Sequence, residues 1–166
     1  MTTYLIDSTN SSVNFSVKHM MIAKVRGGFE KFSGKLIYDE SNPEATQVEA
    51  TIETNSITTR DVQRDTHLKS AEFFDVKTYP HITFISRRVV AGKEALKIVG
   101  DLTIHGVTQS VSLDVKAPSV KIGFSATTKI KRREFGLTWN AALEAGGLLV
   151  GDEVSVSLDI HFVKQA

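Results

Sequence analysis

The chain has 166 residues, which suits one domain with a substantial core and is short for two. Hydrophobic residues make up 41% and charged residues 23%, a composition typical of a globular protein rather than a disordered one. Twenty Lys and Arg against nineteen Asp and Glu leave a net charge of +1, which gives no electrostatic reason to expect nucleic acid as a partner. No apolar run approaches the roughly 18 residues that a membrane-spanning helix needs. The absence of cysteine excludes disulfides, thiolate metal sites and cysteine nucleophiles.

The first residues, Met1–Asp7, have neither the basic start nor the apolar centre of a signal peptide. We therefore expect a cytoplasmic protein, or a periplasmic one whose leader has been removed.

Apolar and polar residues alternate with period two through most of the chain, as Val13, Phe15 and Val17 do near its start. Successive side chains of a strand point to opposite faces, so the pattern predicts strands with one dry face and one wet face. The predicted strands are Val13–His19, Gly28–Asp39, Gln47–Glu53, His81–Val90, Ala95–Ile104, Gln109–Lys116, Lys121–Lys131 and Glu153–Val163, with Tyr4–Ile6 as an additional short strand.

Short turns at Ala91–Glu94 and His105–Thr108 join three of these strands, so Ile82–Val115 is predicted to be an antiparallel meander. A sheet with one dry face must close on itself or be covered by another element. About eight strands in one domain suit an up-and-down barrel of the lipocalin type. We therefore predict an all-β fold, a lipocalin-like eight-stranded antiparallel barrel, as a single domain that spans residues 1–166.

One segment, Thr58–Leu68, breaks the alternation and contains neither Gly nor Pro. Thr58 or Thr59 can cap a helix, and Asp61 then lies in the first turn, where the helix dipole favours a negative charge. We predict a helix of two or three turns here, with a further turn over Ser70–Asp75, as the one short helical crossover of the barrel.

A series of motifs extends over nearly the whole chain. They are Tyr4–Asp7, Gly28-Phe29 with Phe32 and Gly34, Asp65–Asp75, Tyr79–Phe84, Gly100–Thr108, Arg132 with Glu134–Leu137, and Val150–Val154. In composition and order these motifs resemble those of the YceI-like, polyisoprenoid-binding proteins. The resemblance implies a lipocalin-like barrel, often dimeric, whose apolar pore holds a long isoprenoid or similar lipid chain. It implies no catalytic residues, and many members of the family carry a secretion signal.

The candidate lipid-binding residues lie mostly on the inward parity of the strands. They are Phe15, Val17, Met20, Phe29, Phe32, Leu36, Ile52, Phe84, Leu102, Phe124, Phe135 and Trp139. From the residues alone, this set also fits a filled core, because a barrel of about eight strands is either filled by side chains or holds one small ligand. The family resemblance favours a pore. An isoprenoid is hydrocarbon, and each buried CH₂ gains about 0.8 kcal/mol, so tight binding needs no polar anchor.

Two apolar runs lie where turns are expected. Met20–Ala23 fits a deformable pore mouth, because methionine adapts its shape to a ligand, and it fits a plug over the barrel end equally well. Leu148–Val150 allows the same two interpretations and a dimer contact as a third.

Four cationic side chains are candidates for contact with a lipid head group: Arg60, Arg64, His67 and Arg132. Arginine suits phosphate oxygens. The alternative for Arg64 is a solvated ion pair with Asp61, which lies at helical spacing. The alternative for Arg132 is a structural salt bridge.

No catalytic constellation stands out. The five histidines contain no His-x-x-x-His pair, and there is no G-x-S-x-G elbow or phosphate-binding glycine loop. We therefore predict a non-enzymatic carrier, without metal or cofactor, that binds a polyprenyl diphosphate or an isoprenoid quinone and forms a homodimer. The alternative is a stress-response scaffold or interaction protein with a side-chain-filled barrel.

Overall fold

The computed structural model describes residues 1–20, 23–92, 95–119, 123–140 and 150–165. Its strands are β1 (Thr2–Ile6), β2 (Ser12–His19), β3 (Ala23–Phe29), β4 (Phe32–Tyr38), β5 (Gln47–Glu53), β6 (Ile57–Thr58), β7 (His81–Ala91), β8 (Ala95–Ile104), β9 (Val107–Ser119), β10 (Gly123–Lys131) and β11 (Val150–Lys164). The helical elements of the described chain are α1 (Val62–Lys69) and three 3-10 turns, η1 (Pro43–Ala45), η2 (Thr54–Ser56) and η3 (Arg132–Phe135).

Eight strands form a closed antiparallel barrel in the order β1-β4-β5-β7-β8-β9-β10-β11, and the pairing of β1 with β11 closes it. The remaining strands prolong this barrel at one end. β1 and β2 pair with successive parts of β11, β3 pairs with β2, and the short β6 pairs with β3. The predicted all-β, eight-stranded barrel is confirmed.

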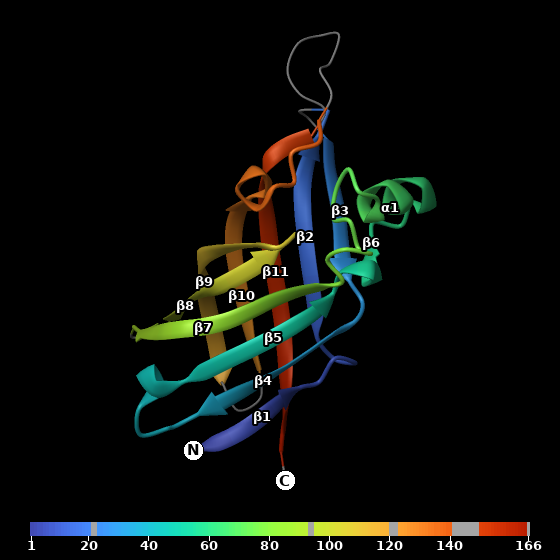
Figure 1. The fold of residues 1–166 in the computed structure, drawn as a ribbon. Helices are drawn as coiled ribbons and strands as arrows, with labels where there is room; N and C mark the ends of the chain where they lie inside the picture. The colour runs from blue at the N-terminus through green and yellow to red at the C-terminus, as the bar shows by residue number, and fades with distance from the viewer. Residues whose placement is uncertain (21–22, 93–94, 120–122, 141–149, 166) are drawn as a thin grey trace.

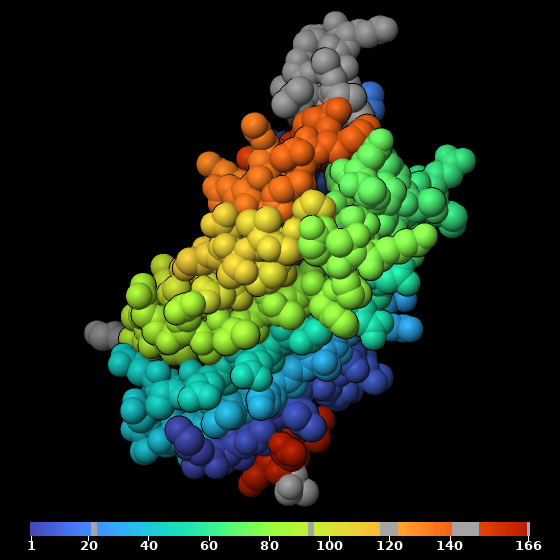
Figure 2. Space-filling model, in the orientation of Figure 1, coloured from blue at the N-terminus to red at the C-terminus, as the bar shows by residue number. Residues whose placement is uncertain are grey.

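We call the part of the barrel beside α1 and η3 the helix half, and the part beside the two chain ends the terminus half. Figure 1 shows β2, β3 and β11 rising past the tilted strands β4, β5 and β7 to the level of α1. In the space-filling view, β1, β4, β5 and β7 form close-packed bands, and the α1 segment stands out from the side of the molecule (Figure 2).

The predicted single strand Gly28–Asp39 is wrong, because β3 and β4 are separate strands with Glu30 and Lys31 between them. The backbone N–H groups of these two residues donate to the carbonyl and the hydroxyl of Ser56, at 3.2 and 3.0 Å. The strand therefore bends at this point toward η2, and its first part, Ala23–Gly27, was missed by the prediction.

The helix begins later than predicted. Asp61, not Thr58 or Thr59, is its N-cap, and the Asp61 side chain accepts a hydrogen bond from the Arg64 N–H at 3.1 Å. Thr58 ends β6 instead. The further turn predicted over Ser70–Asp75 is present as hydrogen-bonded turns.

The predicted meander is confirmed as β7, β8 and β9, paired in sequence. His105 and Gly106 form the β8–β9 connection with φ of 55° and 73°. Positive φ at both central residues matches the twist of a tight hairpin, and glycine adopts it without strain.

The hydrophobic core fills the terminus half. Leu36 and Val115 are each 1% exposed, and the ring of Phe162 packs against Tyr4 and Phe124 with centroids 6.4 and 5.4 Å apart. This core continues along β7 and β8 as far as the helix half, where it meets a cavity.

Candidate functional site

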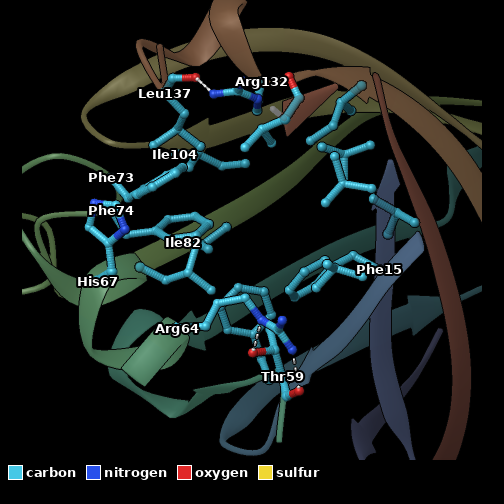
Figure 3. Close-up of a pocket in the computed structure, with 18 of the residues that line it drawn as sticks. Phe15, Thr59, Arg64, His67, Phe73, Phe74, Ile82, Ile104, Arg132 and Leu137 are labelled. Carbon is cyan, nitrogen blue, oxygen red and sulfur yellow. Dashed lines mark hydrogen bonds between the residues drawn. The ribbon is translucent and has the colours of Figure 1, made fainter. Parts of the chain in front are cut away.

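The helix half contains a cavity of about 500 Å³. Small-molecule sites in proteins usually enclose roughly 300–1,000 Å³. Its wall consists of parts of β2, β3, β5, β7, β8, β10 and β11, together with the α1 segment and the chain after η3. Figure 3 shows His67 and Phe15 on opposite sides of the space, and Arg132 and Arg64 at opposite ends.

Strand alternation makes this wall apolar. Val154 of β11 lies between Val17 of β2 and Ile130 of β10, and the next inward residue, Val156, lies beside Phe15. All five side chains line the cavity. Because the pairing is in register, every second residue of three adjacent strands contributes hydrocarbon to one continuous surface.

Aromatic rings form the rest of the wall in two groups. In the first, the ring centroids of His67 and Phe73 lie 4.6 and 5.2 Å from that of Trp139. In the second, Phe29 lies between Phe15 and Phe74, with centroid distances of 5.7 and 6.1 Å. These edge-on and tilted contacts are favourable arrangements of aromatic pairs, and they hold the segment around α1 against the barrel.

The polar side chains of α1 are held by neighbouring groups of the protein. Arg64 donates from Nε to the Thr59 hydroxyl at 2.8 Å and from a terminal nitrogen to the Thr59 carbonyl at 3.0 Å. Asp65 accepts from the Thr59 N–H at 2.8 Å, and Asp61 lies 3.9 Å from Arg64. Nε2 of His67 contacts the Glu72 carboxylate. This network orients α1 over the cavity.

Arg132 is 4% exposed and lines the cavity, yet it binds the protein's own backbone. Its N–H groups donate to the carbonyls of Gly151, Leu137, Trp139 and Val150 at 2.8, 2.7, 2.9 and 3.2 Å. Removal from water lowers the pKa of the guanidinium from its ordinary value.

The arginine thus ties the chain after η3 to the start of β11. The sequence suggested a structural salt bridge for Arg132, and this prediction is wrong. Among the described residues, no carboxylate lies within 4.0 Å of the guanidinium, and its partners are backbone carbonyls.

Six of the predicted lipid-binding residues line the cavity: Phe15, Val17, Phe29, Ile52, Leu102 and Trp139. Three of the four candidate head-group residues, Arg64, His67 and Arg132, also lie at its wall. The structure therefore brings these nine side chains together around one space. Inward parity predicts this only for the five that lie on strands, Phe15, Val17, Phe29, Ile52 and Leu102. Their contact with a lipid stays a prediction.

The other predicted lining residues lie elsewhere. Leu36, Phe84, Phe124 and Phe135 point inward but are buried in the core, at 1%, 9%, 7% and 1% exposure, because they lie where side chains fill the barrel. Phe32 is half-buried beside Ile52, outside the cavity.

Two predicted residues are on the surface. Met20, with φ of 55°, is 52% exposed, because the backbone turns the side chain outward after β2. Arg60 is also exposed, directly before the helix cap, and does not reach the cavity. In the two apolar runs, Ala23 begins β3 and is exposed, and Val150 begins β11 and lines the cavity. Met21, Ile22, Leu148 and Leu149 lie outside the described residues.

Several lining residues were missed, namely Phe73, Phe74, Ile82, Ile104, Val154 and Val156. Four of them lie on the inward parity of predicted strands and could have been added on that ground. The signal for the other two is a pair of adjacent phenylalanines in an otherwise polar turn, because such residues need a surface to cover.

No group of three or more His, Asp or Glu side chains in the described ranges is placed to hold a metal ion. The arrangement offers hydrocarbon surface, aromatic edges and polar groups that are mostly bound to one another.

Comparison with known proteins agrees with this geometry. Residues 4–162 match the model of the YceI-like domain. The chain belongs to the YceI-like domain family. A UPF0312 protein of Staphylococcus aureus strain USA300 is 34% identical over 171 residues, which cover 98% of each chain. The resemblance inferred from the sequence motifs is confirmed.

Solved structures of other proteins share the fold. The crystal structure of BcnA from Burkholderia cenocepacia is 27% identical and superposes with a TM-score of 0.83 over 93% of this chain and 98% of its own. A polyisoprenoid binding domain from Saccharophagus degradans, implicated in plant cell wall breakdown, is 19% identical with a TM-score of 0.71 over 99% and 100% of the two chains. None of the described helices has the length and apolar character needed to cross a membrane.

Proposed function

We propose that the protein binds an isoprenoid lipid in the cavity of the helix half and leaves it chemically unchanged. The observation that carries the proposal is the continuous apolar and aromatic wall, formed by side chains from seven strands and the α1 segment around about 500 Å³. A hydrocarbon chain gains from burial in such a space without any hydrogen bond. The fold shared with a polyisoprenoid binding domain supports the same ligand class.

The positions of the cations favour a neutral head group, as in an isoprenoid quinone, over a diphosphate. Arg64 is bound to Thr59 and Asp61, and Arg132 donates to four backbone carbonyls. A diphosphate that bound to Arg132 would have to displace its backbone carbonyls, and each buried acceptor left without a donor costs about 1–3 kcal/mol. At Arg64 it would compete with Asp61, which already lies 3.9 Å from the guanidinium. A carrier role and a homodimeric state stay predictions from the family resemblance.

The proposal is tested by mass spectrometry of the lipid that co-purifies with the protein from its native host. Val154→Trp places an indole inside the cavity, whereas Ile85→Trp adds the same group at a position that is 54% exposed on the outer face of β7. We expect isoprenoid with the wild-type protein and with Ile85→Trp, and little or none with Val154→Trp. A wild-type protein that carries no lipid after repeated native preparations, or equal lipid in both variants, contradicts the proposal and favours the scaffold alternative.

Head-group charge is tested separately with farnesol and farnesyl diphosphate, which share one hydrocarbon chain. We expect farnesol to bind at least as tightly as the diphosphate. A diphosphate that binds more than about tenfold tighter, with the advantage lost in Arg64→Gln, would instead assign a phosphate site to the α1 end of the cavity.

A further inference from the structure

The depth of the cavity has a defined floor. Ile52 of β5 and Ile82 of β7 are paired, and both line the cavity. The next inward position of β7 is Phe84, which lies between Ala50 and Leu102 on the neighbouring strands. Leu102 still lines the cavity, whereas Phe84 belongs to the buried core and is 9% exposed. The open space therefore ends at Ile52, Ile82 and Leu102, and the Phe84 ring lies in the core directly behind this floor.

The ring of Phe84 occupies space that a neighbouring residue leaves free. A Cβ atom at Gly100 would lie 2.5 Å from Cζ and 2.8 Å from Cε2 of Phe84, closer than any normal contact. Since Gly100 has no side chain, the ring lies against β8 and fills the barrel at this level. Beyond it, toward the chain ends, Leu36, Phe124 and other residues of the buried core occupy the interior.

We propose that Phe84 sets the length of the lipid chain that the cavity buries, at about three isoprene units. The inference rests on the proposed function and adds chain-length selection to it. The cavity volume equals that of about 17 water molecules at about 30 Å³ each, and a chain carbon with its hydrogens takes up about the same space as one water. About 15 carbons therefore fill the cavity, and the units of a longer chain that follow remain outside it.

The substitution Phe84→Ala removes six ring carbons at the floor and so makes room for about one more five-carbon unit. Phe124→Ala is the matched control, because it removes the same ring from the same core cluster at a similar exposure, 7% against 9%. Phe124 packs against Phe162 and is paired with Ile160, away from the cavity wall. A space opened there does not deepen the cavity.

The experiment measures the dissociation constants of geraniol, farnesol and geranylgeraniol, which have two, three and four isoprene units. Binding is followed through the fluorescence of Trp139, the single tryptophan of the chain and part of the cavity wall. For the wild-type protein we expect farnesol to bind about tenfold or more tighter than geraniol, and geranylgeraniol to gain nothing further. In Phe84→Ala, geranylgeraniol should bind about tenfold tighter than farnesol, whereas Phe124→Ala should keep the wild-type order.

Leu102→Phe provides a variant that does not depend on the folding of Phe84→Ala. It adds bulk at a residue that lines the floor, so it should abolish the advantage of farnesol over geraniol. If the wild-type protein binds the prenols and both Phe84→Ala and Leu102→Phe keep its chain-length order, the proposed role of Phe84 is wrong. The proposed function still stands in that case. Failure of the wild-type protein to bind any of the three alcohols contradicts the proposed function itself.

Discussion

The two halves of the barrel share the long strands β7, β8, β10 and β11 and the same alternation, yet one is filled and the other is open. In the terminus half, strand pairs with strand around the whole circumference, and large side chains such as Leu36 and Phe124 belong to one buried cluster. In the helix half, β6 has only two residues, and α1 with the turns after it completes the wall. The α1 segment is not hydrogen-bonded into the sheet as a strand would be, and the cavity lies between this segment and the strands. The same alternation of apolar and polar residues therefore accompanies a filled core where strands complete the barrel, and a cavity where the α1 segment completes the wall.

The largest expected contrast compares one phenylalanine from each half. Phe124→Ala should lower the free energy of unfolding by about 3–5 kcal/mol, because it leaves a void in a tightly packed core. Phe15→Ala should cost about 1–2 kcal/mol, because the half-buried Phe15 ring already faces open space. Urea unfolding measures both. Equal losses would mean that the helix half is packed as tightly as the terminus half.

The next effect tests what holds the helix half together. Arg132→Met should lower the free energy of unfolding by about 3 kcal/mol, because it leaves buried carbonyls without donors. Arg132→Lys keeps the charge but a single ammonium cannot reach acceptors on both chain segments, so we expect most of the same loss. A lysine variant as stable as the wild-type protein would show that the charge, and not the fork of the guanidinium, stabilises this end.

The smallest effect concerns the outside of the terminus half, where Arg87 of β7 and Asp101 of β8 form an ion pair at 2.5 Å. The hydrogen bond from Arg87 holds the pKa of the Asp101 carboxyl below its ordinary value. A carboxyl with a lowered folded pKa stabilises the protein above its unfolded pKa, and that contribution is lost as the pH falls through the folded value. Asp101→Asn should thus be slightly less stable than the wild-type protein at neutral pH, with the difference shrinking below about pH 4.

Stability measured against pH in low and high salt checks this prediction. The difference between the two proteins should also shrink in high salt, because the pair is on the surface. A difference that persists in acid would mean that Asp101 stabilises the sheet by something other than its charge.

Much of the fold could be predicted because strand alternation is a local property. The meander from β7 to β9 follows from period two and its short connections, and the change of period at Thr58–Leu68 located the helix to within a few residues. The break between β3 and β4 could not be predicted, because it depends on Ser56, which is distant in sequence and accepts and donates hydrogen bonds at that point. Likewise, the sequence allows Thr59 as the N-cap of the helix, but in the structure the Thr59 hydroxyl is bonded to the side chains of Arg64 and Asp65.

The sequence predicts which side chains of the candidate site face inward, but not where along the barrel the cavity ends. Parity along a strand states that Phe15 and Phe84 both face inward, and both do. It does not say how far along the barrel axis a residue lies, because that position depends on how its strand pairs with strands from other parts of the chain. Phe15 lines the cavity, whereas Phe84 lies in the buried core.

The sequence by itself determined a closed antiparallel barrel, its dry interior and its family, because alternation and ordered motifs are written along the chain. Only the tertiary structure decided where the interior stays empty. That outcome depends on where the fold places the α1 segment, Arg132 and the filled core around Phe84. The volume of a cavity is a property of all the side chains around it, not of any one stretch of sequence.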